Sequence, residues 1–81
     1  MDNTFIKIES KDTISLINLS QISSVHMYDT SLYFNSDITN YYFLKIILNT
    51  PIDNVINLEF ENKFKRDLAF DKIENNLNVI I

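Results

Sequence analysis

Residues 55–77 read VINLEFENKFKRDLAFDKIENNL, and the hydrophobic period changes within this stretch. Its first residues alternate between apolar and polar, which predicts a strand over 55–60 with one buried face. The remainder contains no Gly or Pro and is rich in helix formers, which predicts a helix over 62–77 with Asn62 as its N-cap. One side of this helix is apolar and should pack on a sheet; its residues are Ala69, Phe70, Ile73 and Leu77.

The sequence before this stretch predicts further short strands separated by polar turns. Residues 4–9 and 13–18 both alternate and flank a polar turn, so they should pair as a hairpin. Three more strands are predicted over 22–28, 31–35 and 41–49. The chain is therefore expected to be one α+β domain, residues 1–81, with about six short antiparallel strands in a bent sheet or roll that one C-terminal helix closes.

The middle of the chain carries the most local predictions. Ile22 is out of phase with the residues after it, which predicts a bulge near Ser23 and Ser24. A turn is expected at Asp29 and Thr30, and a polar loop over 36–40. Within the strand between these two, the pattern predicts that the apolar residues Leu32 and Phe34 are buried and that Tyr33 points the other way.

Residues 41–49, YYFLKIILN, are apolar on both faces apart from Lys45. This pattern is typical of a central strand or of a strand at an interface. If the strand lay at a free edge of the sheet, it would invite pairing with another chain.

The composition excludes several classes of site. The chain of 81 residues has no Gly and no Cys. Without Gly it has no phosphate-binding loop, dinucleotide fingerprint or nucleophile elbow, and without Cys it has no disulfide, thiol nucleophile or Cys-based zinc site. The turns must use other residues, so any residue with a positive φ is expected to be Asn or Asp.

The excess of Ile and Asn, beside the missing Gly, indicates a gene rich in A and T, as in some bacteria, phages and mobile elements. The N-terminal residues MDNTFIKIES show no secretory signal, and Lys45 interrupts the most hydrophobic segment. The expected location is the cytoplasm, which is that of the host if a phage encodes the chain. The net charge of −4 disfavours direct binding to a nucleic-acid backbone.

Few residues offer catalytic or metal-binding chemistry. His26 is the single histidine and could act as a general base only beside a nucleophile or an orienting carboxylate; otherwise it is a surface histidine on a strand. Asp67, Asp71 and Glu74 share one helix side, where they could bind a divalent cation, mimic a run of phosphates or simply form a solvated face. No catalytic residue, cofactor or metal site is assigned from the sequence, and no enzyme is expected.

Aromatic residues offer a different kind of surface. The tyrosines are Tyr28, Tyr33, Tyr41 and Tyr42. Tyrosine and phenylalanine on a sheet pack into a core, form protein interfaces or stack on single-stranded nucleic acid, and the last role requires more basic neighbours than Lys45.

The helix has a second apolar side formed by Phe64 and Leu68. Its expected cover is a second copy, another protein or residues 79–81 of this chain, unless the helix begins after Lys65 and Phe64 joins the core. The predicted protein interface consists of Phe64, Leu68, Tyr33, Tyr41, Phe43, Asp67 and Asp71.

The segment INLSQISSV (residues 17–25) and the stretch over 55–77 resemble a loose family of small bacterial and phage proteins with a pleckstrin-homology-like roll of strands and a C-terminal helix. The resemblance implies a fold and no activity, and no family site is carried over. It covers most of the chain, but its motifs are degenerate.

The sequence therefore favours a non-catalytic protein-binding module, acting as an inhibitor, adaptor or accessory subunit. If a phage or mobile element encodes it, the expected role is action against a host defence system. A homodimer is expected, and a membrane partner is not. The alternatives are a small structural subunit of a virion or complex, and a module that binds single-stranded nucleic acid through sheet aromatics.

Overall fold

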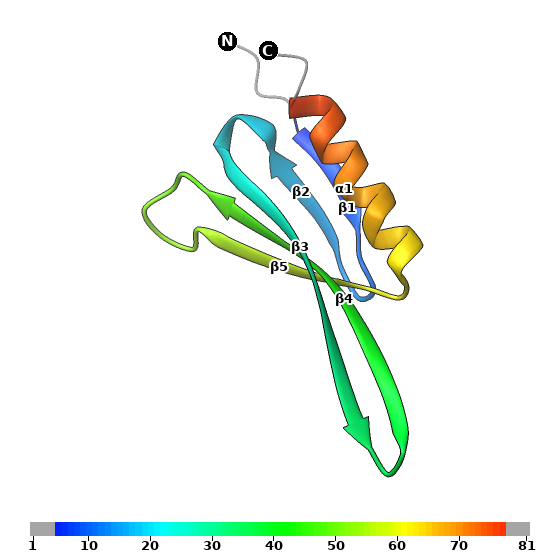
Figure 1. Ribbon diagram of the computed structural model, residues 1–81. Helices are drawn as coiled ribbons and strands as arrows, with labels where there is room; N and C mark the ends of the chain where they lie inside the picture. The colour runs from blue at the N-terminus through cyan, green and yellow to red at the C-terminus, as the bar shows by residue number, and fades with distance from the viewer. Residues whose placement is uncertain (1–4, 78–81) are drawn as a thin grey trace.

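The computed structural model describes residues 5–77 and shows an α+β fold with antiparallel strands and one C-terminal helix (Figure 1). The elements in chain order are β1 (Phe5–Glu9), β2 (Ile14–Asn18), a short 3₁₀ turn η1 (Leu19–Gln21), β3 (Ile22–Phe34), β4 (Asp37–Leu48), β5 (Val55–Phe60) and α1 (Lys63–Leu77). They form a hairpin of β1 and β2 and a sheet in the order β3-β4-β5. The predicted fold class is confirmed, with five strands instead of six.

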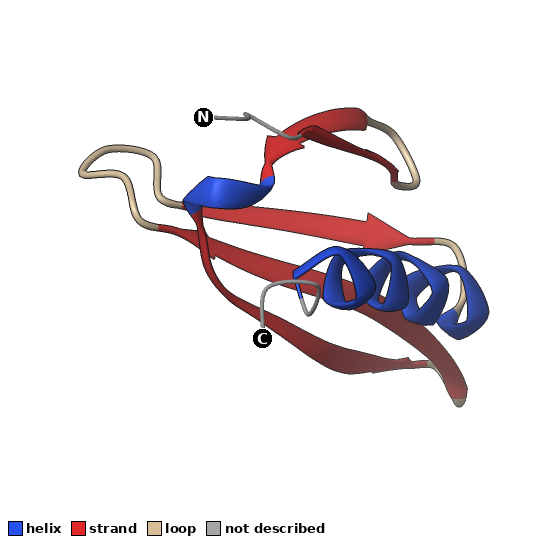
Figure 2. Ribbon diagram, turned by 90° about the horizontal axis from the view of Figure 1, so that it is seen from above, coloured by secondary structure: helices blue, strands red, loops and turns tan. Residues whose placement is uncertain are grey.

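The core lies where the helix and the β1–β2 hairpin meet one face of the three-stranded sheet (Figure 2). Each layer contributes buried aliphatic or aromatic side chains, which are Ile6, Ile8 and Ile17 from the hairpin, Leu44, Ile46, Leu58 and Phe60 from the sheet, and Ala69 and Ile73 from the helix. Phe70 and Leu77 pack against this cluster, so the predicted buried side of the helix is confirmed. Among residues 5–77, no helix is both long and apolar enough to cross a membrane.

Two local predictions are confirmed, the N-cap of the helix and the bulge in β3. The Asn62 side chain accepts a hydrogen bond of 2.8 Å from the Lys65 backbone N–H, which confirms it as the N-cap. The register of β3 against β4 shifts between Ile22 and Ser24, which confirms the predicted bulge.

The prediction of a turn at Asp29 and Thr30 was wrong. β3 continues through both residues, which pair with Tyr42 and Tyr41 of β4. The predicted loop over 36–40 is also wrong, because β4 begins at Asp37. Polar residues there suggested a loop, but a two-stranded ribbon with solvent on both faces can carry polar side chains on either face. The two predicted strands over 22–28 and 31–35 are therefore one strand, which explains the lower strand count.

The hairpin turn consists of Asn35 and Ser36, with φ of 48° and 69°. Positive φ at both central positions is the mark of the type I′ turn, whose twist matches that of the flanking strands. Asp53 also has a positive φ, of 52°. The expectation that such residues are Asn or Asp is right for Asn35 and Asp53 and wrong for Ser36, where the twist of the hairpin imposes the conformation on a serine.

The strand over 41–49 is central: β4 has β3 on one side and β5 on the other over Tyr42–Ile47. β4 therefore has no free edge over these residues, so the hypothesis that its apolar side chains mark an edge open to another chain is wrong. β3 and β5 are the outer strands of this sheet.

Candidate functional site

The most prominent surface feature is the far part of the β3–β4 hairpin, which projects from the rest of the molecule (Figure 1). We call residues 29–41 the arm, and residues 5–28 and 42–77 the body. Pairing with β5 begins only at Tyr42, so the arm is a ribbon of two strands. The molecule measures 54 × 26 × 22 Å and has a radius of gyration of 14.1 Å. A compact chain of this length would have a radius of gyration of ~12 Å.

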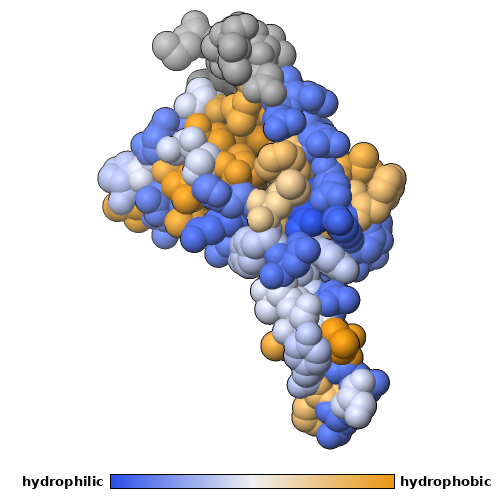
Figure 3. Space-filling view, viewed as in Figure 1, coloured by the Kyte–Doolittle hydropathy of each residue, from blue (hydrophilic) through white to orange (hydrophobic). Residues whose placement is uncertain are grey.

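The arm carries large apolar side chains in solvent. The exposed fractions are 55% for Leu32, 76% for Tyr33, 75% for Phe34 and 58% for Ile38. The predicted burial of Leu32 and Phe34 is therefore wrong, because no layer of the body covers them. Tyr33 and Ile38 are direct cross-strand partners on one face of the ribbon, and Leu32 and Phe34 lie on the other. Figure 3 shows apolar side chains beside polar ones at the end of this projection.

The arm continues onto a face of the sheet that the helix does not cover, which we call the open face. Its aromatic residues form a row: the ring centroids of Tyr28 and Phe43 are 5.0 Å apart, and those of Tyr41 and Phe43 are 6.5 Å apart. The Tyr28 hydroxyl donates to Asn57 Oδ1 at 3.4 Å. The predicted interface residues Tyr41 and Phe43 thus lie together on the open face, whereas Tyr33 points from the opposite face of the ribbon.

Arg66 joins the base of the arm to the first turns of α1. It is buried, and its Nη1 donates to the Asp29 carboxylate and to the Tyr28 carbonyl oxygen at 3.2 Å. Its Nε donates to Asp67 at 2.8 Å, and its guanidinium lies 5.7 Å from the centre of the Tyr42 ring. Burial lowers the pKa of Arg66, but hydrogen bonds and charge attraction from Asp29 and Asp67 outweigh it, so the pKa is raised above its ordinary value.

The sequence reading did not single out Arg66. The helical period places it three residues before Ala69, four before Phe70 and seven before Ile73, on the buried side. A lone arginine on an otherwise apolar helix side predicts nearby carboxylate partners, because a buried charge needs them. Asp67, predicted as part of the interface, is one of those partners.

The second apolar side of the helix is exposed as predicted, with 71% of Phe64 and 52% of Leu68 accessible to solvent. Asp71 is also exposed. Residues 79–81, one proposed cover, lie outside the described residues. The predicted interface residues therefore do not form one group: Tyr41 and Phe43 lie on the open face, Tyr33 lies on the opposite face of the arm, and Phe64 and Leu68 lie on the outer side of α1.

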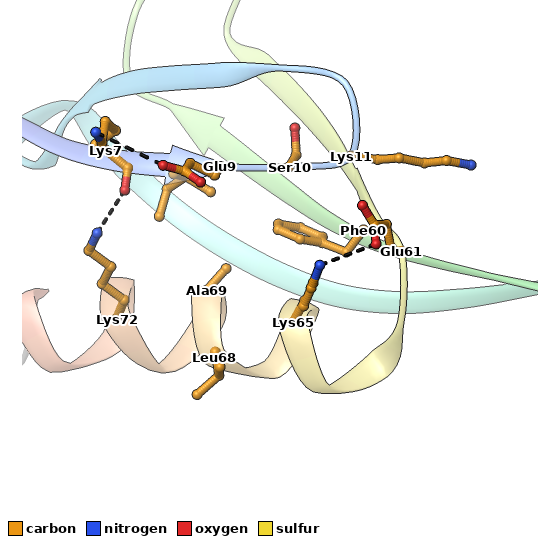
Figure 4. Close-up of a pocket in the computed structure, with 11 residues that line it drawn as sticks. Lys7, Glu9, Ser10, Lys11, Phe60, Glu61, Lys65, Leu68, Ala69 and Lys72 are labelled. Atoms are coloured by element: carbon orange, nitrogen blue, oxygen red, sulfur yellow. Dashed lines mark hydrogen bonds and ion pairs between the residues drawn. The ribbon is translucent and has the colours of Figure 1, made fainter.

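A groove of about 400 Å³ lies between α1 and β1 (Figure 4). Ile8, Phe60 and Ala69 form its apolar part, and four lysines surround it: Lys7, Lys11, Lys65 and Lys72. Each lysine has a partner within the chain. Lys7 lies 4.0 Å from Glu9, Lys65 lies 3.2 Å from Glu61, and Lys72 Nζ donates to the Lys7 carbonyl oxygen at 2.8 Å. Lys11 lies 3.5 Å from Glu59. These lysines are thus paired within the chain, and exposed pairs of this kind add little stability.

The remaining candidates for chemistry lie on exposed surfaces. His26 Nε2 is 3.1 Å from the Ser24 hydroxyl on the open face, and within residues 5–77 no carboxylate hydrogen-bonds to its ring. Such a pair lacks the group that would orient a general base. Within the described part of the chain no three His, Asp or Glu side chains are grouped as metal ligands, and Asp67 bonds Arg66 instead of facing a cation with Asp71 and Glu74.

Comparisons with protein-family models, with curated proteins and with solved structures gave no match. The resemblance to a pleckstrin-homology-like roll stays a prediction.

Proposed function

We propose that this protein is a non-catalytic protein-binding module that presents the arm to its partner. The observation that supports this function is the exposure of Leu32, Tyr33, Phe34 and Ile38 on a ribbon that projects from a packed body. Single exposed apolar residues are common on proteins, whereas a group of them marks an interaction surface.

The chemistry of the arm supports a protein partner. Between Thr30 and Asn40 the only charged residue is Asp37. Protein interfaces are depleted in charged residues at their centre and enriched in aromatic ones. A two-stranded ribbon is only marginally stable in water, so further strands or an apolar cover would stabilise it. Both properties favour an arm that functions when a partner covers it.

The anchoring of the arm supports the same function. Arg66 ties Asp29 and the Tyr28 carbonyl to the helix, which restrains the base of the ribbon against the body. A surface that is already oriented loses less entropy on binding. An inhibitor, an adaptor and an accessory subunit would each use such a device, and an inhibitor of a host defence system or a small virion subunit would be special cases.

The test is to capture the partner with an affinity-tagged chain in a lysate of the producing cell. The variant Leu32→Ser/Phe34→Ser removes apolar surface from the arm without touching the core, so it should fold normally by circular dichroism and lose the captured protein. The matched control Phe64→Ser/Leu68→Ser changes the outer side of the helix and should keep it. Equal capture by wild type and the arm variant would reject the arm as the binding surface.

The aromatic row supports a second candidate, a module that binds single-stranded nucleic acid. Tyr28, Tyr41 and Phe43 lie on an uncovered sheet face, and Lys45 and His26 are cross-strand neighbours there. Against this, the Tyr28 and Phe43 rings lie nearly parallel, at 16°, and already stack on each other. A mobility shift of a single-stranded oligonucleotide at low salt, lost in Phe43→Ala, would favour this candidate.

A further inference from the structure

We propose that the partner of the arm is the arm of a second copy of this chain. The two β3 strands would pair edge to edge and antiparallel about a two-fold axis near Ser31, so that two three-stranded sheets become one continuous sheet. This inference rests on the proposed function, because it names the occupant of the binding surface.

Within residues 5–77 the outer edge of β3 has no strand beside it, and α1 contacts it at the base of the arm, where Arg66 donates to the Tyr28 carbonyl oxygen and to Asp29. Among the described residues β3 pairs with β4 alone, although it is 13 residues long. Proteins usually protect such edges with Lys, Pro, bulges or short strands. β3 has no Lys and no Pro, and its bulge lies at the far end, between Ile22 and Ser24. The part of β3 in the arm therefore keeps a row of backbone groups ready to pair.

The side chains of this edge are compatible with their own copy. A two-fold axis at Ser31 places Tyr28 opposite Phe34 of the other copy and Thr30 opposite Leu32, all on the face that continues the aromatic row. The charged residue Asp29 falls opposite Tyr33 and not opposite its own copy. Like charges directly opposite would destabilise the pair, and this register avoids them.

The surface area also fits a dimer. The molecule exposes 5949 Å². A compact monomer of 9.5 kDa exposes about 5,000 Å². The molecule therefore exposes roughly 900 Å² more than a compact shape would, and a standard interface buries ~800 Å² per partner, so its elongated surface is large enough to form one. Pairing of the arms would bury part of this surface and give each ribbon the additional strands that an isolated hairpin lacks.

An introduced thiol tests the position of the axis, because the natural chain has no Cys. Residues facing each other across the axis of an antiparallel pair are within disulfide distance. Under mild oxidation Ser31→Cys should form a linked dimer rapidly, even at low protein concentration. The matched control is Asn75→Cys on the exposed side of α1, which should stay single. Equal linking of both variants, linking of the control alone, or no linking of either would overturn the proposal.

Light scattering after size exclusion gives an independent readout that needs no thiol. Wild type should have twice the mass of the chain, and Leu32→Lys, which puts a charge on the edge, should have the mass of one chain. Phe64→Lys on the helix should remain a dimer. Dissociation by Phe64→Lys but not by Leu32→Lys would place the interface on α1 and overturn the proposal.

The failure of this inference and that of the proposed function give different results. A monomeric wild type overturns self-pairing, and the proposed function stands if the Leu32→Ser/Phe34→Ser variant still loses a captured protein. A dimer that Leu32→Lys dissociates confirms self-pairing even where no other protein is captured.

Discussion

The same two strands, β3 and β4, build both the body and the arm, yet the two parts differ in what covers them. In the body β4 lies between β3 and β5, and one face of the sheet packs against α1 and the β1–β2 hairpin. In the arm β5 is absent and α1 reaches only Asp29 at the base, and apolar residues of the same types are exposed. Burial is thus decided by the neighbouring layer and not by the strand's own composition.

The largest expected effect on stability comes from comparing the same substitution, Leu→Ala, in the body and in the arm. Leu44 is fully buried in β4 and Leu32 is exposed in β3. Leu44→Ala leaves a cavity and should lower the free energy of unfolding by about 2–5 kcal/mol. Leu32→Ala leaves none and should change it by less than about 0.5 kcal/mol. Urea unfolding followed by circular dichroism measures both.

Similar losses in the two variants would contradict the contrast between body and arm. If the arms pair, the small loss in Leu32→Ala should grow with protein concentration, because dimer formation stabilises only the folded chain. The loss in Leu44→Ala should depend much less on concentration.

The difference between the two parts also explains what the sequence could and could not predict. Helix and strand signals in the body are periodic because a shared core selects them, so the helix over 62–77 was predicted within one residue of α1. The arm has solvent on both sides, so no face selects for apolar residues. Leu32 and Phe34 were read as buried because alternation alone cannot show whether a second layer exists. Arg66 was missed because its carboxylate partner Asp29 is distant in the sequence.

The second prediction concerns the link between the two parts. Arg66→Met removes the hydrogen bonds to Asp29, Asp67 and the Tyr28 carbonyl but keeps an apolar side chain of similar length. The two carboxylates are about half exposed and can be hydrated, so the free energy of unfolding should fall only moderately, by about 1–3 kcal/mol. Hydrogen exchange should accelerate most at the base of the arm. The control Lys63→Met, at an exposed position in the same helix, should change neither quantity.

The pH dependence of this link follows from the raised pKa of Arg66. A group whose pKa is raised on folding contributes stability that is complete below its unfolded pKa and is lost only as pH rises through the folded value. The unfolded pKa of arginine already lies in the strongly alkaline range. The difference in the free energy of unfolding between wild type and Arg66→Met should therefore be the same at neutral and moderately alkaline pH. A difference that falls over this range would contradict the inference that Arg66 stays charged there.

The third prediction concerns the start of α1, which positions Arg66 one turn later. Asn62→Ala removes the bond from the Lys65 N–H and should cost about 1 kcal/mol. Loosening of this turn should also increase exchange at the base of the arm, though less than Arg66→Met does. Asn75→Ala, on the exposed side of the same helix, serves as the control and should leave thermal stability unchanged or slightly higher. Equal losses in the two Asn variants would argue against the cap.

The smallest effect is expected at the tip of the arm, farthest from the core. Ser36 has a φ of 69°, which a residue with a Cβ adopts at a cost and Gly adopts freely. Ser36→Gly produces the Asn-Gly pair that type I′ turns favour and should stabilise the arm locally by less than about 1 kcal/mol, since the greater freedom of Gly in the unfolded chain offsets part of the gain. Exchange of the arm amides should slow, while the urea midpoint of the body stays the same. The matched control is Thr39→Gly, within the arm's paired strand, where the same residue should speed exchange. A rise in the stability of the whole molecule in Ser36→Gly would show that arm and body unfold as one unit, and would remove the distinction on which the comparison rests.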